Sequence, residues 1–167
     1  MVDDSDARAV ISFEVIDPLH ADAVWALGEY FAELDRRFPE GFDPGDAITG
    51  DADRLRPPNG CFVVVRFGNE SDARTVGCAG LQTIDDGVGE LKRMWLDRSA
   101  RGRGLGKRLL TEIETRSRAL GHHTLRLDTN ANLPEAVGLY EGAGYRRISR
   151  YNDNPYPDFF FEKRLSE

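Results

Sequence analysis

The chain of 167 residues and 18.7 kDa has the size of a single domain, with 40% hydrophobic and 31% charged residues. This composition is typical of a soluble globular protein, and no run approaches the ~20 apolar residues that a membrane span requires. The formal net charge of −7 disfavours nucleic acid as a partner and is compatible with amines and other cations.

Two cysteines and three histidines limit the redox and metal chemistry. Cys61 and Cys78 each lie in an apolar run, so we expect buried free thiols and no disulfide framework. No Cys/His cluster has the spacing of metal ligands, and no metal is expected. The N-terminal segment MVDDSDARAV is acidic and lacks the basic and apolar regions of a secretory signal, which favours the cytoplasm.

The N-terminal third predicts a strand and two helices. The segment Ala9–Ile16 reads as a strand that ends at Asp17-Pro18. Apolar residues then recur at helical spacing from about His20 to Arg37 and predict an amphipathic helix. A short second helix is expected over Asp46–Arg56, ahead of the turn cluster Pro57–Gly60.

Three strands in hairpin order are predicted next. The run Cys61–Phe67 is rich in β-branched residues and ends at Gly68-Asn69. A second strand, Thr75–Ile84, turns at Asp86-Gly87 into a third, Val88–Leu96.

The C-terminal part predicts helices that alternate with strands. A second amphipathic helix follows the loop Arg101–Gly106 and is expected to end near Leu120. A helix set between two strands implies that those strands run parallel, so the sequence predicts a mixed α/β sheet. The remaining predicted elements are a strand at Thr124–Asp128, a helix at Pro134–Gly142, and strands at Tyr145–Tyr151 and Phe159–Leu165.

The most informative segment is the loop RGRGLGK, residues 101–107, between a predicted strand and a predicted helix. Its three alternating glycines let the backbone approach a ligand, and the following helix offers unpaired N–H groups and a positive dipole end. Seven basic residues and one acid lie between Leu91 and Arg108, against the acidic balance of the whole chain. The segment predicts a pyrophosphate site; the alternative is a glycine-rich turn with solvated arginines.

Two common nucleotide motifs do not fit this loop. A dinucleotide fingerprint needs a third glycine where Lys107 stands, and a Walker loop needs Ser or Thr where Arg108 stands. The loop instead resembles the signature Q/R-x-x-G-x-G/A of the GNAT-type N-acetyltransferases, through Arg101, Gly104 and Gly106.

The resemblance extends to two further segments. Residues 89–96 (GELKRMWL) resemble the family's central strand, which splays from its neighbour and contacts the pantetheine arm of the cofactor. Residues 132–145 resemble a later motif of Asn, Ala, Tyr and Gly-Tyr. Order and spacing agree from about Cys61 to the C-terminus. The resemblance implies a mostly antiparallel sheet with one parallel, splayed pair, flanked by helices, in a single domain: residues 1–59 form a variable acceptor side and residues 60–167 the acetyl-CoA-binding core.

The resemblance also implies transfer of an acetyl group from acetyl-CoA to a primary amine, without a metal. Asn132 would either contact the pantetheine or cap the helix that begins at Pro134. The expected cofactor-binding residues are Met94, Trp95, Leu96, Arg101, Gly102, Arg103, Gly104, Leu105, Gly106, Lys107, Asn132, Ala136 and Tyr140.

Glu90, on the central strand, is the candidate general base. The attacking amine must be neutral although the pKa of a lysine-like amine is about 10.4, and a carboxylate can take its proton directly or through a water. Strand alternation would place Glu90, Lys92, Met94 and Leu96 on one face. The alternative for Glu90 is an ion pair with Lys92 or Arg93.

Tyr140 is the candidate general acid, because a phenol with a pKa of ~10 can protonate the departing thiolate. The alternative for Tyr140 is packing in the core. The backbone N–H of Met94, left unpaired where the strands splay, would bind the oxyanion.

Contacts to the acceptor are expected on the first helix. Tyr30, Glu33 and Arg37 fall on one face, where Glu33 could hold an ammonium and Arg37 a carboxylate, as in an amino acid or a similar zwitterion. The alternative is a solvated helix rim. Asn154 belongs to a segment that would form another wall of the pocket. The run Phe159–Phe161 is expected to pack at the sheet edge or in a homodimer interface.

The leading interpretation is a cytoplasmic acetyl-CoA-dependent N-acetyltransferase that acts on a small-molecule amine, with no nucleic-acid or membrane partner. A protein acceptor is the main alternative within this class, and a toxin-like enzyme that acetylates charged tRNA is disfavoured by the net acidity. A non-catalytic acyl-CoA sensor is the alternative from another class, and the pair Glu90 and Tyr140 argues against it.

Overall fold

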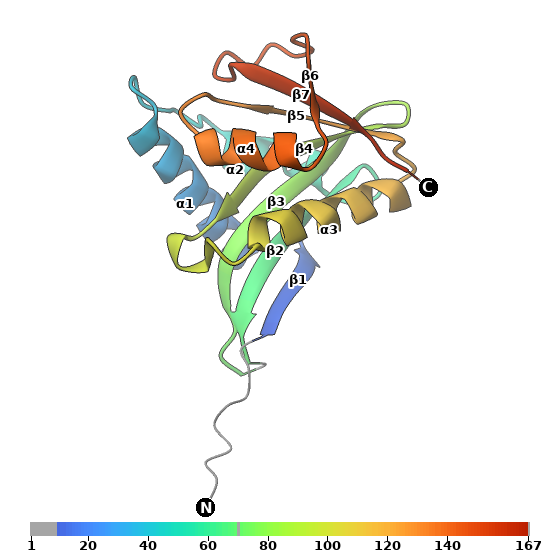
Figure 1. The fold of residues 1–167 in the computed structure, drawn as a ribbon. Coiled ribbons are helices and arrows are strands. Elements are labelled where there is room, and N and C mark those ends of the chain that lie inside the picture. Colours follow the sequence, from blue (N-terminus) through green and yellow to red (C-terminus); the bar gives the residue numbers. More distant parts are fainter. Residues whose placement is uncertain (1–9, 70, 167) are drawn as a thin grey trace, which may run out of the picture.

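The computed structural model describes residues 10–69 and 71–166. These residues form one seven-stranded sheet with the order β1-β2-β3-β4-β5-β7-β6 and helices on both faces (Figure 1). None of the helices within these ranges has the length and apolar character of a bilayer span. In chain order the elements are β1 (Val10–Ile16), α1 (Ala21–Arg37), α2 (Ala47–Gly50), a 3-10 turn (Ala52–Leu55), β2 (Gly60–Gly68), β3 (Arg74–Asp85), β4 (Val88–Leu96), a second 3-10 turn (Arg98–Ala100), α3 (Leu105–Ala119), β5 (Thr124–Thr129), α4 (Pro134–Gly142), β6 (Arg146–Ile148) and β7 (Phe159–Arg164).

The predicted elements are present with small changes of boundary. The predicted first strand begins at Ala9, which lies outside the described residues together with most of the acidic N-terminal segment. The helix expected over Asp46–Arg56 is divided, because α2 ends at Gly50 and glycine is a weak helix former. The strand expected over Tyr145–Tyr151 is reduced to β6, because the chain leaves the sheet after Ile148.

The pairing of β4 with β5 interrupts an otherwise antiparallel sheet. Strands β1 to β4 pair antiparallel, as do β5 with β7 and β7 with β6. The parallel contact joins Val88–Glu90 to Thr124–Arg126 and goes no further along either strand. Beyond Glu90 the two strands therefore diverge. The predicted mixed sheet, mostly antiparallel with one parallel and splayed pair, is confirmed.

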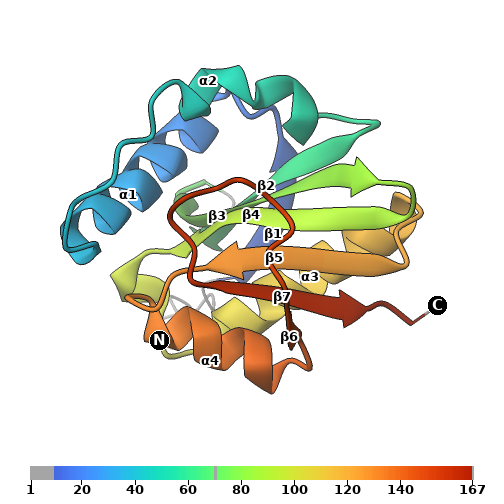
Figure 2. The ribbon, with the colours of Figure 1, turned by 90° about the horizontal axis from the view of Figure 1, so that it is seen from above.

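Both faces of the sheet are buried. Helix α1 covers one face, and α3 and α4 cover the other (Figure 2). In β2 the side chains of Cys61, Val63 and Val65 pack toward α3, whereas Phe62 and Val64 pack toward α1. A strand buried on both sides has no polar face, which explains the continuous apolar run in its sequence.

Both cysteines are buried free thiols, as predicted. Burial raises the pKa of Cys78 to about 12, so this thiol stays protonated. Its Sγ donates to the carbonyl oxygen of Arg93 at 3.3 Å, within the sheet.

Arg93 forms a bulge in β4. Its φ of 57° lies in the left-handed region, and the register between β3 and β4 shifts at this point. The extra residue puts Leu91 and Met94 on the same face, toward α3, while Trp95 packs on the α1 side. The predicted alternation, which placed Met94 on the face of Glu90, is therefore wrong beyond the bulge.

Tyr145 is buried in the core, and its hydroxyl has no hydrogen-bond partner among the described residues. A buried polar group without a partner costs about 1–3 kcal/mol of folding free energy. We expect Tyr145→Phe to raise the melting temperature by about 2–4 °C for each kcal/mol regained. The control is Tyr151→Phe, which removes a hydroxyl that donates to Glu90 at 2.7 Å and should lower the melting temperature. Destabilisation by Tyr145→Phe would contradict the prediction and indicate an ordered water on the hydroxyl.

Candidate active site

Two adjoining cavities lie where β4 and β5 diverge. The first, of about 290 Å³, borders the segment between β6 and β7, and the second, of about 340 Å³, borders the loop of residues 101–107. Their junction lies between β4, α1 and α4. The residues that line both cavities are Tyr30, Leu34, Met94, Leu133, Ala136 and Tyr140.

The glycine-rich loop and the first turn of α3 line the second cavity. Gly102 and Gly104 have φ values of 78° and 73°, and a Cβ on either would meet no atom within 4 Å. Gly104 is the N-cap of α3 and brings no side chain to cap the first N–H groups of the helix. Lys107 adds a positive charge to the lining. Open backbone, helix N-terminus and lysine together suit a diphosphate.

Arg101 fixes this loop to two neighbouring elements. Its Nε donates to the carbonyl oxygen of Leu96 at 2.9 Å, at the end of β4. One of its terminal nitrogens donates to Glu33 of α1 at 2.6 Å. Glu33 is only 7% exposed, and a carboxylate so buried needs a charged partner of this kind.

The three acceptor residues predicted on α1 divide between the cavities. Tyr30 lines both, whereas Glu33 and Arg37 line only the second. Arg37 pairs with Glu135 of α4, and Glu33 pairs with Arg101. The two charged side chains that were expected to hold a zwitterion therefore form ion pairs within the chain, and they do not line the first cavity of the described structure.

Two of the predicted cofactor residues, Arg103 and Asn132, line neither cavity; the others all line the second. The guanidinium of Arg103 lies over the ring of Phe67, 5.6 Å from its centroid. The exposed Asn132 donates to Asn130 at 2.8 Å. The N-cap of α4 is Leu133, so the alternative role of Asn132 as the cap is wrong.

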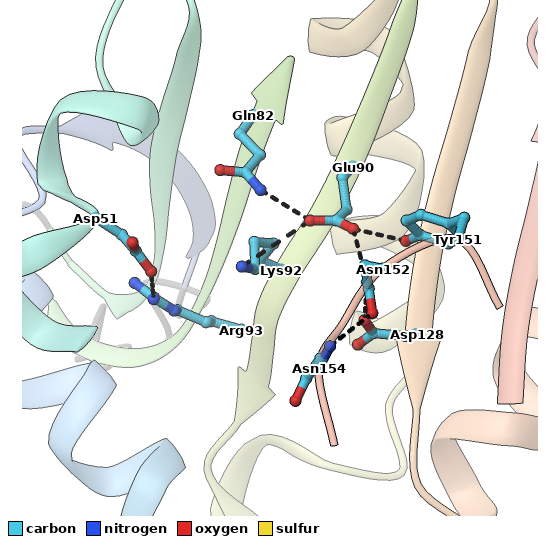
Figure 3. A network of polar contacts seen from close by, with 9 residues as sticks. All are labelled: Asp51, Gln82, Glu90, Lys92, Arg93, Asp128, Tyr151, Asn152 and Asn154. Carbon is cyan, nitrogen blue, oxygen red and sulfur yellow. Dashed lines mark hydrogen bonds and ion pairs between the residues drawn. The ribbon is translucent and has the colours of Figure 1, made fainter. Parts of the chain in front are cut away.

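Glu90 is buried, with 4% exposure, at the last position where β4 pairs with β5. Gln82 donates to its Oε1 at 2.8 Å, and Tyr151 donates to its Oε2 at 2.7 Å (Figure 3). The ammonium of Lys92 lies 3.9 Å from Oε1, while Arg93 pairs elsewhere. Glu90 is absent from the lining of both cavities within the described structure, so its carboxylate lies behind the site.

Asp128, at the end of β5, is a site carboxylate that the sequence reasoning missed, and it lines the first cavity. Asn152 donates to Asp128 at 2.7 Å and to Glu90 at 3.4 Å, and so bridges the two carboxylates (Figure 3). Burial raises the pKa of Asp128, and the charge of Glu90 raises it further, while hydrogen bonds from Asn152 and Asn154 act in the opposite direction. The sequence contained one indication of this role. Asp128 lies near the carboxyl end of a strand that was predicted to run parallel to its neighbour, and ligand sites form at the carboxyl ends of parallel strands.

Tyr140 of α4 lies at the junction of the cavities and is 6% exposed. Its hydroxyl lies 3.9 Å from the Sδ of Met94. Burial raises the pKa of Tyr140, and the charge of Asp128 raises it too, so the phenol keeps its proton. Burial raises the pKa of Tyr30 as well. The junction therefore holds two neutral phenols close to a carboxylate.

The segment between β6 and β7 forms part of the wall of the first cavity, through Asn154, Tyr156 and Pro157. The aromatic run that follows it lies inside the sheet, because β7 pairs with β5 on one side and β6 on the other. Phe161 is fully buried in the core of its own chain. The expectation that this run lies at a sheet edge is therefore wrong, and Phe161 is not available to a dimer interface.

Comparison with known proteins gives a consistent family assignment. The model of the acetyltransferase (GNAT) family matches residues 27–145. IAA acetyltransferase of Azospirillum brasilense is 32% identical over 145 residues, which cover 84% of this chain and 91% of that protein. An uncharacterized N-acetyltransferase of Schizosaccharomyces pombe is 30% identical over 117 residues, which cover 70% of each chain.

Solved structures show the same architecture. A candidate acyl-CoA N-acyltransferase from Klebsiella pneumoniae superimposes with a TM-score of 0.75 at 27% identity, over 94% of this chain and 99% of the other. A GNAT-family acetyltransferase from Staphylococcus aureus gives a TM-score of 0.79 at 19% identity, over 94% and 100% of the two chains. At that lower identity the likeness concerns the fold alone.

Proposed function

The chain belongs to the acetyltransferase (GNAT) family, and from this premise we propose that it transfers the acetyl group of acetyl-CoA to the primary amine of a small molecule. One observation carries the proposal: the two cavities meet at Met94 and Tyr140, one beside a glycine-rich loop and the other beside Asp128. A thioester entering through the second cavity would meet an amine entering through the first.

The loop of residues 101–107 would hold the diphosphate of acetyl-CoA. Its open backbone at Gly102 and Gly104, the N-terminus of α3 and the charge of Lys107 support this role. The end of β4 and Ala136 of α4 would flank the extended arm that leads to the junction. When bound, acetyl-CoA supplies an activated carbonyl carbon.

Asp128 is the proposed proton acceptor and Tyr140 the proposed proton donor. As the amine nitrogen bonds to the carbonyl carbon, its proton passes to Asp128, directly or through a water. As the carbon–sulfur bond breaks, the phenol proton of Tyr140 passes to the sulfur. Met94 lies beyond the last pair of β4 with β5, and its backbone N–H is the proposed donor to the carbonyl oxygen.

Glu90 takes a positioning role in this proposal, in place of the catalytic role expected from the sequence. Its carboxylate shares Asn152 with Asp128, and its charge raises the pKa of Asp128. A carboxyl group of raised pKa is a stronger base toward an ammonium. Glu90 would thus tune the base without touching the amine.

The size of the first cavity supports a small acceptor. A volume of about 290 Å³ lies at the lower end of the range for small-molecule sites. The direct test is release of CoA thiol from acetyl-CoA with a panel of small primary amines and short peptides. Release that depends on small amines supports the proposal. Release with peptides alone would indicate a protein acceptor, and binding of acetyl-CoA without release would identify a sensor; both results would overturn it.

Acetyl-CoA is expected to stabilise the fold through this loop. At ~100 times its Kd a ligand adds about 2.7 kcal/mol of stability, or about 5–10 °C in melting temperature for a chain of this size. Gly104→Val should abolish that increase, because the branched side chain would project into the second cavity and valine does not tolerate the positive φ.

Gly121→Val is the matched control. Gly121 has a φ of 88° and equally open surroundings, and it is absent from the lining of both cavities in the described structure. Both variants should therefore lose similar stability without ligand, while only Gly121→Val keeps the increase with acetyl-CoA. A full increase in Gly104→Val would reject the loop as the diphosphate site.

A further inference from the structure

One wall of the first cavity is made of aromatic rings from three separate segments. Phe31 and Phe38 come from α1 and its C-cap, Phe42 from the loop before α2, and Tyr156 from the segment between β6 and β7. Phe31 stacks on Phe42 with ring centroids 5.6 Å apart and 15° between the planes. Phe42 contacts Tyr156 at 4.5 Å between centroids, and Phe38 lies 6.0 Å from Tyr156. Ring against ring, these side chains form one apolar surface.

The cations of this cavity are already paired. Arg93 is buried, pairs with Asp51, and lies over the ring of Phe31 at 5.7 Å. Lys92 has its ammonium 3.9 Å from Glu90. Among the described residues these two are the cations that line the cavity. A carboxylate or phosphate on the acceptor would compete with a carboxylate of the protein for either of them.

The anions of the cavity outnumber its cations. Asp43, Asp51 and Asp128 line it, and Glu90 lies directly behind. Asp51 is matched by Arg93 and Glu90 by Lys92, which leaves the charges of Asp43 and Asp128 unmatched within the described part of the chain. The electrostatic field therefore favours a cation and opposes an acceptor that carries an anionic group.

From these observations we infer that the acceptor is a primary amine joined through a short alkyl chain to an aromatic ring, with no anionic group. The ring would lie against Phe42 and Tyr156, and the chain would bring the amine to Asp128 and the junction at Tyr140. This inference rests on the proposed function and narrows its substrate class. It replaces the zwitterion that the charges of α1 suggested.

The first experiment compares kcat/KM for three acceptors in the CoA-release assay: phenethylamine, L-phenylalanine and n-butylamine. L-phenylalanine adds a carboxylate to the first compound, and n-butylamine lacks its ring. We expect phenethylamine to exceed L-phenylalanine by at least about tenfold, because like charges oppose the carboxylate. We expect it to exceed n-butylamine by about 3- to 10-fold or more through ring stacking.

The second experiment removes the flat wall and keeps its apolar volume. Phe42→Leu should lower kcat/KM for phenethylamine by about 3- to 10-fold, mainly through KM, and should lower kcat/KM for n-butylamine by a smaller factor. Tyr156→Leu tests the same wall if the first variant does not fold. Phe159→Leu is the control, because it is the same substitution at a residue that lines neither cavity in the described structure.

Three outcomes would overturn the inference. The first is a kcat/KM for L-phenylalanine equal to or above that for phenethylamine. The second is a higher kcat/KM for n-butylamine than for phenethylamine. The third is a ratio of these two kcat/KM values that stays unchanged in both Phe42→Leu and Tyr156→Leu. In each of these cases amines are still acetylated, so the proposed function would stand. Thiol release with none of the small primary amines of the panel would overturn both the inference and the proposed function.

Discussion

Replacing Tyr140 with phenylalanine is expected to lower kcat by about 10²–10⁴-fold, the usual loss when a general acid is removed. The substitution deletes one oxygen and keeps the ring, so the packing of α4 and the affinity for acetyl-CoA should survive. The loss should therefore appear in kcat and not in the Kd measured by calorimetry. It should also shrink with a thioester whose thiol is more acidic, because a better leaving group needs less help from an acid.

Tyr145→Phe is the matched control for this experiment. Tyr145 packs near Tyr140, with ring centroids 6.0 Å apart, but it lines neither cavity in the described structure. Its hydroxyl should be irrelevant to turnover. Unchanged kcat in Tyr140→Phe would remove Tyr140 from the mechanism, and an unfolded variant would show that the residue is needed for the core.

Replacing Asp128 with asparagine is expected to lower kcat/KM by about 10²–10⁴-fold, the usual effect of losing a general base. The rate of the wild-type enzyme should fall as the pH falls through the pKa of Asp128, since only the ionised carboxylate accepts a proton. Burial and the charge of Glu90 raise that pKa, so the acidic limb should lie above pH 3.8, the ordinary value for aspartate. The pH–rate profile of kcat/KM is the measurement.

Glu90→Gln separates the two carboxylates. It removes the charge that helps raise the pKa of Asp128, so the acidic limb should move to lower pH while turnover at neutral pH falls less than in Asp128→Asn. A larger loss in Glu90→Gln than in Asp128→Asn would restore Glu90 as the base.

The raised pKa of Asp128 also makes a prediction about stability. A carboxyl group whose pKa is raised in the folded state binds its proton more tightly there, so its ionisation at neutral pH opposes folding. Asp128→Asn should therefore raise the melting temperature at neutral pH, and this gain should disappear as the pH falls below the pKa of Asp128. An enzyme that becomes more stable as it becomes inactive would mark Asp128 as a residue kept for function.

Local patterns predicted most of the fold. Helix α1 was predicted from apolar residues that recur at helical spacing, and β2 from a continuous apolar run. Both patterns involve residues close together in the sequence, so they can be recognised without knowledge of the fold. The loop of residues 101–107 was found for the same reason, because a glycine-rich turn before a helix is a local feature. The contacts of Arg101 in this loop with Leu96 and Glu33 were not predicted, because these contacts depend on how distant segments pack together.

The details of the site depended on features that periodicity cannot show. One extra residue at Arg93 reverses the faces of β4, so Met94 was assigned to the wrong side. Whether Glu90 or Asp128 is the better candidate for the general base depends on where β4 and β5 stop pairing. The sequence of either strand alone does not indicate that position. The sequence predicted that Glu33 and Arg37 lie on one face of α1. It did not predict that each forms an ion pair with a residue from another segment of the chain.

The early end of the pairing between β4 and β5 leaves each strand with backbone edges that face the interior. An unpaired edge on a protein surface is a template on which another chain can add a strand, and it is a common origin of aggregation. Here Tyr30 of α1 and Ala136 of α4 line both cavities beside the gap, so helices flank it on both faces of the sheet. We expect this gap to offer backbone donors and acceptors to an extended ligand, and the flanking helices to hinder a strand of another protein from pairing there.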